Sequence, residues 1–299
     1  LDMLALKYPF HQLNLEDCLS KIQISKIDRH QSHSFIILRL PSVDRHGSDE
    51  IGPVMVDQLS VFIGPDYLVT VHSPSFPTLA QLFQSCKKDK SLMGRSPGFL
   101  LHLIIDGLVD ELLNTLEHIE GDLDSIEDAV FDGKSSVSTQ IAMLRREITS
   151  LKRTVIPLRR VVSELSTEIE RFSNCQNLAP YFSDVKDHIE KVLEELEASK
   201  ETVEIYKDTN YTTSTERSNK ILGLLTILFT LTIPVTVLSS FYGMNIEIPG
   251  TIQSGPWNFL GPYTTMIIVI VWSIAPSLAM LWYFYRKKWM KLLKNIKLL

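Results

Sequence analysis

The stretch Tyr242-Gly243-Met244-Asn245 ends an apolar run, residues 221–241, and a second apolar run covers residues 263–285. Neither run contains Lys, Arg, Asp or Glu, and each is about as long as the ~20 residues that a helix needs to cross a bilayer core. We therefore expect two membrane-spanning helices, at about 221–242 and 263–285, joined by a loop at 243–262.

Charge distribution predicts the orientation of these helices. Glu247 is the one charged residue of the loop, whereas six Lys and Arg residues follow the second span in residues 286–299. Because positively charged flanks favour the cytoplasmic side, the C-terminus is expected there. With two spans, the N-terminal part is then cytoplasmic too, and the loop faces outward from the inner or plasma membrane.

The part before the spans, residues 1–220, is acidic. Its 24 Lys and Arg against 34 Asp and Glu give a net charge of −10, compared with +6 for the tail. These charges suit a protein that handles cations on an anionic leaflet, and ordinary solubility and topology are the alternative explanation, which charge alone favours. No basic patch with interleaved aromatic residues occurs, which disfavours nucleic-acid binding. The eight His are scattered and no catalytic motif appears, which argues against an enzyme.

The first 97 residues have the pattern of a small α/β cytosolic domain. Runs rich in β-branched and aromatic residues occur at 35–40 and 58–63, and a Gly-Pro-Asp turn leads to a third run at 67–72. A short helix is predicted at 77–86. Nothing in this domain indicates catalysis.

Helix-period patterning dominates residues 98–220. An amphipathic helix with an acidic distal half is predicted over 99–131 and a basic helix over 139–174, packed antiparallel with acidic face toward basic face. No Pro or Gly interrupts the chain from Tyr181 to Gly223, so a long stalk should run into the first span. The predicted fold class is an α+β cytosolic domain with a long helical stalk continuous with the first of two C-terminal transmembrane helices, arranged as domains 1–97, 98–220 and 221–299.

A two-span chain cannot enclose a water-filled path alone, so a pore requires several copies around an axis. Helical spacing selects one face of the first span: Asn219, Leu222, Thr226, Phe229, Ile233, Thr236 and Ser240. Four of these seven are polar, which is unexpected for a lipid-facing stripe. Thr and Ser also bond back to the helix backbone, and Pro234 frees carbonyls for them, so spacing alone leaves both interpretations open.

Placed after the first of two C-terminal spans, the Gly-Met-Asn tripeptide resembles the signature of the CorA family of divalent-cation channels. Four other segments are similar to the same family: Pro180–Val185, Leu103–Asp110, Ile156–Arg159 and His11–Asp17. The resemblance implies a funnel-shaped homopentamer in the lipid bilayer, without a catalytic cofactor. It also implies a selectivity filter at Tyr242, Gly243, Met244 and Asn245, and adds Leu225 to the pore-facing positions.

Mg²⁺ is, by this resemblance, both the transported and the regulatory ion. Mg²⁺ dehydrates reluctantly, and a ring of Asn245 oxygens can accept hydrogen bonds from its waters without stripping them. In the family, Mg²⁺ bound between the cytosolic parts of adjacent subunits holds the gate shut, and the resemblance gives Asp184 as one ligand of such a site and Asp106 as a second candidate. Ordinary solvated stalk charges are the alternative interpretation of both residues.

The loop after Asn245 departs from the usual family pattern. Its continuation Ile246-Glu247-Ile248-Pro249-Gly250 carries a single charge and is similar to the branch of the family that moves zinc. The predicted function is therefore an Mg²⁺ uptake channel, with Co²⁺ and Ni²⁺ as further ions. A proton-coupled zinc transporter of the same fold is the alternative, and a membrane-anchored coiled-coil scaffold or sensor is the alternative from another class.

Overall fold

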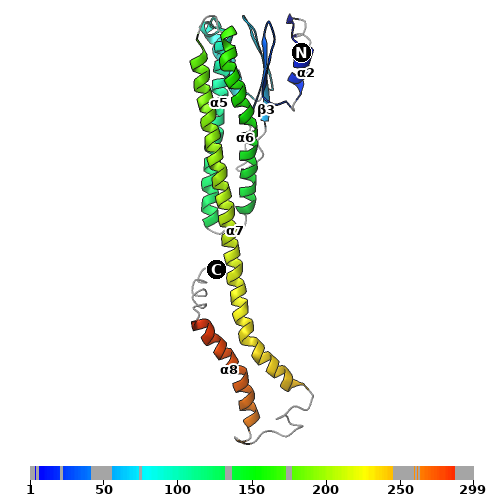
Figure 1. Cartoon of the computed structure of the whole chain (residues 1–299), viewed down its shortest axis with the longest axis vertical. Coiled ribbons are helices and arrows are strands. Elements are labelled where there is room, and N and C mark those ends of the chain that lie inside the picture. The colour runs from blue at the N-terminus through cyan, green and yellow to red at the C-terminus, as the bar shows by residue number, and fades with distance from the viewer. Residues whose placement is uncertain are drawn as a thin grey trace. The chain divides into compact units, whose positions relative to one another are not determined.

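The protein is described by a computed structural model (Figure 1), in which the chain divides into two compact units, Leu1–Asn210 and Tyr211–Leu299. The described residues are 4, 7–20, 23–41, 56–73, 76–131, 137–172, 177–244, 259, 261 and 263–286. Each unit is treated by itself below.

The first unit contains a four-stranded antiparallel sheet in the order β1-β2-β3-β4. The strands are β1 (Lys26–Arg29), β2 (Ser34–Pro41), β3 (Val56–Ile63) and β4 (Leu68–His72). The three predicted strands are confirmed to within two residues at each end. Strand β1 was not predicted, because its sequence Lys-Ile-Asp-Arg contains a single apolar residue.

Both faces of the central strands are buried, because side chains alternate along a strand. On one face, Ile36 and Leu38 of β2 and Val61 of β3 join the main core beneath the long helices. On the other face, Phe35 and Phe62 pack against the segment that leads into the short helix α2 (Gln12–Leu19). The sheet thus forms a middle layer.

Long helices make up the rest of this unit. After α3 (Pro77–Lys88) and α4 (Lys90–Met93) come α5 (Pro97–Phe131) and α6 (Val137–Glu168), with a 3₁₀ turn η1 (Ile169–Phe172) after α6. Helix α7 (Ala179–Gly243) then runs without interruption into the second unit. The predicted helices are therefore confirmed in number and order over residues 97–243, and their ends differ by only a few residues apart from the 3₁₀ turn.

The expected partner of the basic helix is wrong. Arg145 Nε of α6 lies 2.9 Å from Glu204 of α7, and Lys152 pairs with Glu197 of α7. These residues are seven apart on each helix, so two turns of α6 match two turns of antiparallel α7. Arg145 and Lys152 of α6 therefore pair with α7, where the sequence analysis had paired the basic face of α6 with α5.

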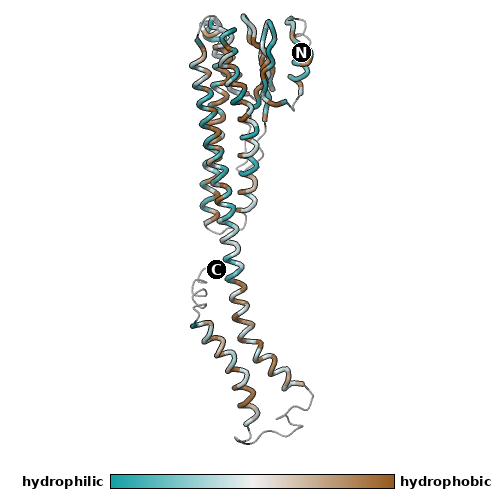
Figure 2. The backbone as a smooth tube through the Cα atoms, in the orientation of Figure 1, coloured by the Kyte–Doolittle hydropathy of each residue, from teal (hydrophilic) through white to brown (hydrophobic). Residues whose placement is uncertain are grey.

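The second unit holds two apolar helices, the end of α7 and α8 (Thr264–Arg286), both long and apolar enough to cross a membrane. Figure 2 shows hydrophobic residues gathered along both. Ser277 Oγ of α8 donates a hydrogen bond to the Leu231 carbonyl oxygen at 3.0 Å. Half-buried positions on α7 recur at helical spacing and define the face toward α8: Gly223, Ile227, Thr230, Leu231, Pro234, Leu238 and Tyr242.

Candidate functional site

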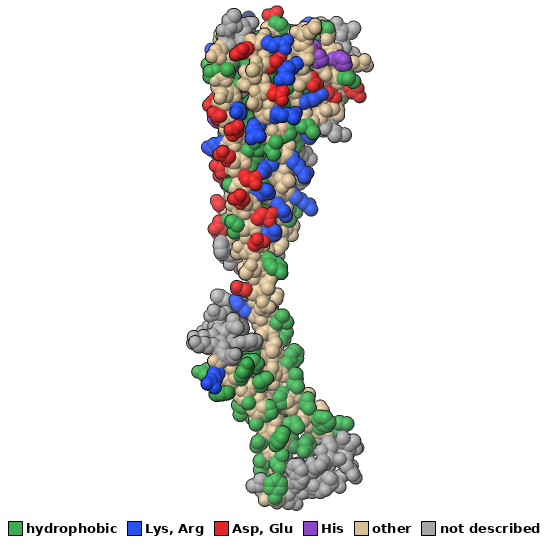
Figure 3. All heavy atoms as spheres, in the orientation of Figure 1, with side chains coloured by type: hydrophobic (Ala, Val, Ile, Leu, Met, Phe, Trp, Pro, Cys, Tyr) green, Lys and Arg blue, Asp and Glu red, His purple; other side chains and the backbone are tan. Residues whose placement is uncertain are grey.

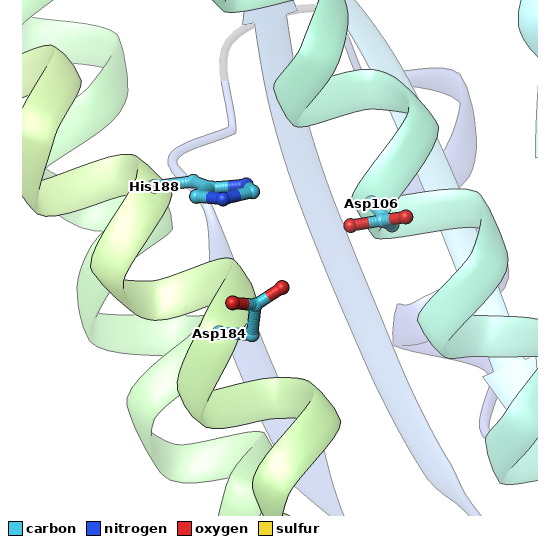
Figure 4. Close-up of side chains that lie close together, drawn as sticks. All are labelled: Asp106, Asp184 and His188. Carbon is cyan, nitrogen blue, oxygen red and sulfur yellow. The ribbon is translucent and has the colours of Figure 1, made fainter.

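Three metal-ligating side chains meet between two helices of the first unit. Asp106 of α5 and the pair Asp184 and His188 of α7 bring one ligand atom each within 4.8 Å of one another. Figure 4 shows His188 and Asp184 on one helix, pointing toward the helix that carries Asp106. The cluster is partly exposed, since Asp184 is open to solvent and the other two are half-buried.

Local sequence explains why these side chains meet. Asp184 and His188 are four residues apart, so they lie on one face of α7 a single turn apart. Their neighbours Val185 and Ile189 are fully buried, as is Ile105 beside Asp106. The apolar contacts hold the two helices together, and the polar side chains lie at the edge of that seam.

His102 lies one turn before Asp106 on α5 and is 7% exposed. Its ring lies 5.2 Å from the ring of Tyr181 and 5.8 Å from that of Phe182. Burial lowers the pKa of His102, while the negative charges of Asp106 and Asp184 oppose that shift. A buried Nδ1 atom without a hydrogen-bond partner is found both in His102 and in His188.

The cluster combines two carboxylates with an imidazole. Carboxylate oxygens suit Mg²⁺, whereas an imidazole nitrogen adds affinity for Co²⁺, Ni²⁺ and Zn²⁺. Such a donor set can therefore hold a divalent cation of either kind. The sequence analysis had named Asp106 and Asp184 together but had left His188 among the eight scattered histidines, although its four-residue spacing from Asp184 was a visible signal.

The polar stripe predicted along the first span lies on α7 away from α8. Each of its members is exposed in the single chain: Asn219, Leu222, Leu225, Thr226, Phe229, Ile233, Thr236 and Ser240. At 3.6 residues per turn, the mean direction of this stripe is about 140° from that of the face toward α8. Packing of α8 thus leaves the stripe uncovered.

Hydroxyl groups in the stripe are bonded to their own helix. Thr226 donates to the Leu222 carbonyl at 2.8 Å, and Thr236 donates to the Thr232 carbonyl at 2.9 Å. This is the back-bonding that the sequence analysis weighed against a pore. A hydroxyl that donates to its backbone keeps its oxygen lone pairs, so these threonines can still accept hydrogen bonds from water.

Three residues of the Tyr-Gly-Met-Asn stretch are described. Tyr242 is half-buried on the side of α8, Gly243 ends α7, and Met244 is exposed. A Cβ atom added at Gly243 would meet nothing within 4 Å. Within the described residues of a single chain, a larger side chain would therefore fit at position 243. Asn245 and Glu247, predicted as selectivity residue and outer-loop charge, lie outside the described residues.

Comparison with known proteins covers almost the whole chain. The family model described as CorA-like Mg²⁺ transporter protein matches residues 1–287. The cobalt/magnesium transport protein CorA of Thermotoga maritima is 24% identical over 285 residues, which cover 95% of this chain and 78% of that protein. The zinc transport protein ZntB of Yersinia enterocolitica is 24% identical over 188 residues, or 62% of this chain and 54% of that protein.

The fold has a solved counterpart. The structure of the CorA magnesium transporter from Methanocaldococcus jannaschii superposes with a TM-score of 0.76 at 19% identity, covering 95% of this chain and 86% of that chain. This likeness confirms, for the single chain, the predicted small sheet, long helix and two C-terminal apolar helices.

Proposed function

Since this chain belongs to the family of CorA-like Mg²⁺ transporter proteins, and so is a divalent-cation transporter and not an enzyme, we propose that its cargo is Mg²⁺, with Co²⁺ and Ni²⁺ as further ions. The names of its relatives support this choice of ions: cobalt/magnesium for the bacterial CorA protein and magnesium for a yeast relative that covers 91% of this chain. Transport at the inner or plasma membrane, with both termini cytoplasmic, follows from the charge asymmetry of the flanks.

The path of the ion is a pore between copies of the chain. The observation that carries this proposal is the polar stripe of α7, which α8 leaves uncovered on a helix otherwise apolar enough for lipid. In a ring of copies, that stripe faces a shared axis and its hydroxyl oxygens meet water. Leu222, Leu225 and Ile233 on the same face supply an apolar constriction that closes by dewetting.

Assembly is supported by a second stretch of α7. Residues 211–222 are all exposed in the single chain, although helices in proteins draw most of their stability from packing. A bundle of α7 helices from several copies supplies the missing packing. We propose a homopentamer, the number implied by the family resemblance.

Selection of the ion is assigned to Asn245 at the outer end of α7. Its side-chain oxygen is neutral, so a ring of such oxygens binds the hydration shell of Mg²⁺ and still releases the ion. The exposed Met244 and the open space beside Gly243 leave room for neighbouring copies at this end of the helix.

Regulation is assigned to Asp106, Asp184 and His188. Their ligand atoms lie close enough to share one divalent cation, and the cluster is in the first unit, which the proposed orientation puts in the cytoplasm. Occupancy at high internal Mg²⁺ ties α5 to α7 and thereby disfavours the movement of α7 that opens the pore. The imidazole of His188 makes the same cluster responsive to Co²⁺ and Zn²⁺.

A zinc transporter is the second candidate. The relative from Yersinia, the single charge in the loop and the imidazole in the metal cluster favour it. The deciding experiment is ion flux into proteoliposomes of the full chain, with Mg²⁺ or Zn²⁺, with and without a proton gradient. Mg²⁺ entry without a gradient is expected, whereas Zn²⁺ flux that follows the gradient would replace the Mg²⁺ proposal.

A further inference from the structure

Most of the carboxylates of helix α5 lie on one face. The helix contains no Lys or Arg, and five exposed carboxylates fall within a single arc of about 100° at 3.6 residues per turn: Glu117, Glu120, Asp124, Glu127 and Asp128. We call this the acidic face. Within the described part of the chain, Glu117, Glu120, Asp124 and Asp128 form no ion pair.

Helix α6 carries a groove of the opposite charge. The basic groove, of about 790 Å³, is lined by Arg145, Arg146, Arg153 and Lys207 and by no acidic residue. Arg145 and Lys207 both pair with Glu204 at its border. Arg146 and Arg153 form no ion pair with any described residue, so half of the groove's charge is unmatched.

A second groove of similar size contains basic residues that pair with carboxylates of the same chain. That groove, of about 810 Å³, is lined by Arg29, Arg159, Arg160 and Lys186 together with Glu164 and Glu190. Arg29 lies 3.0 Å from Glu164, and Lys186 lies 3.5 Å from Glu190. The basic groove contains no such internal carboxylate, which points to a partner outside the subunit.

We propose that the acidic face of one copy docks into the basic groove of the next copy, so that subunits assemble head to tail. Figure 3 shows acidic and basic side chains gathered toward opposite edges of the helical layer of the first unit, as a repeating side-by-side contact requires. A contact between identical patches would instead oppose like charges, which costs free energy. Head-to-tail contacts form a ring when the rotation between copies closes, and this inference therefore rests on the proposed homo-oligomer.

The heights of the charges along the helices agree with this contact. Asp124 lies seven residues before the end of α5, and Arg146 lies nine residues after the start of α6. Glu117 and Arg153 lie fourteen and sixteen residues from the same ends. Because α5 and α6 form a hairpin, both pairs differ in height by about 3 Å at 1.5 Å per residue, and rotation about an axis parallel to the helices keeps those heights.

Disulfide cross-linking between separately tagged full-length chains tests the contact. Cys18, Cys86 and Cys175 are first replaced by Ser, and chains carrying Asp124→Cys are co-assembled with chains carrying Arg146→Cys. A mixed dimer is expected on oxidation, and neither variant should cross-link to itself. Asp124→Cys mixed with Arg159→Cys, a residue of the other groove, is the matched control and should stay uncross-linked.

Charge reversal provides an independent measurement. Native mass spectrometry of Arg146→Glu with Arg153→Glu should show association weakened about tenfold, the scale of coupling between close charge pairs, and adding Glu117→Arg with Asp124→Arg should restore it. High salt should weaken the wild-type contact in the same direction.

Three outcomes would overturn the inference. One is self-cross-linking of Asp124→Cys, which indicates an isologous contact; another is an oligomer in which no mixed dimer forms. The third is that inorganic pyrophosphate stabilises the wild type but not Arg146→Glu, while no mixed dimer forms. The groove would then be an anion site. Flux is measured on the same preparations, so a failure of transport is recognised separately from a failure of this contact.

Discussion

The hydroxyl of Ser277 on α8 lies 3.0 Å from the carbonyl oxygen of Leu231, three residues before Pro234 on α7. A proline has no backbone N–H, so the helix around it has fewer donors for its carbonyls. Pro234 therefore leaves the Thr230 carbonyl without its usual backbone donor, and Ser277 ties α8 to the adjacent carbonyl of Leu231. This contact determines which face of α7 remains free.

Replacement of Ser277 by Ala should loosen the two membrane helices. Hydrogen bonds between membrane helices contribute about 0.6 kcal/mol on average and up to about 1.7 kcal/mol. We expect a loss in this range, measured as a lower melting temperature in detergent. Ser239→Ala, an exposed serine of α7, is the control and should leave the melting temperature unchanged.

Asp184→Asn should weaken inhibition by internal Mg²⁺. The substitution removes one of two carboxylates from the proposed regulatory cluster, and calorimetry on the full chain should show a loss of metal affinity. Asp187→Asn, an exposed acid on the same helix outside the cluster, is the control. Unaltered inhibition in Asp184→Asn would remove the cluster from regulation.

His188→Ala should lower the affinities for Co²⁺ and Mg²⁺ by different amounts. Because the imidazole contributes more to Co²⁺ than to Mg²⁺ binding, affinity for Co²⁺ should fall more than affinity for Mg²⁺. Parallel titrations of the two metals measure the ratio. An equal loss for both would show that His188 only positions its neighbours.

Asn245→Ala should abolish selective Mg²⁺ flux while leaving assembly intact. The alanine side chain cannot accept hydrogen bonds from the hydration shell of the ion. Flux into proteoliposomes and native mass spectrometry are measured together. Flux equal to that of the wild type would contradict the role given to Asn245.

His33 predicts a dependence of stability on pH. The side chain is 2% exposed, its ring lies 4.7 Å from that of His30 and 5.2 Å from that of Phe10, and the Ser32 hydroxyl lies 3.1 Å from its Nδ1. Burial, with a smaller contribution from His30, lowers the pKa of His33. The unfolded chain therefore takes up a proton first, and stability should fall as pH drops below the ordinary histidine value of ~6.5.

Thermal unfolding at pH 7.5 and pH 5 measures this effect. His33→Phe, which fits among Phe10 and Phe62, should reduce the difference between the two melting temperatures. His118→Asn, at an exposed position of α5, should leave that difference unchanged. A wild-type melting temperature that rises on acidification would contradict the sign.

Periodicity predicted most of the fold because each long helix buries a regular apolar stripe. Strand β1 was not predicted, since its four residues form a strand only by pairing with β2. The partner of the α6 bases could not be read from sequence either, because α5 and α7 both carry carboxylates at suitable spacing and only packing chooses between them. His188 was missed for a similar reason: its role depends on Asp106, 82 residues away in the chain.

The exposed stretch 211–222 of α7 also bears on the lifetime of the protein. A copy without partners presents Arg217 and Lys220 on an exposed helix segment, which transient opening makes available to trypsin-like proteases. Once neighbours cover the segment, those bonds are protected. In the proposed oligomer, cellular proteolysis would thus remove single subunits and spare complete assemblies.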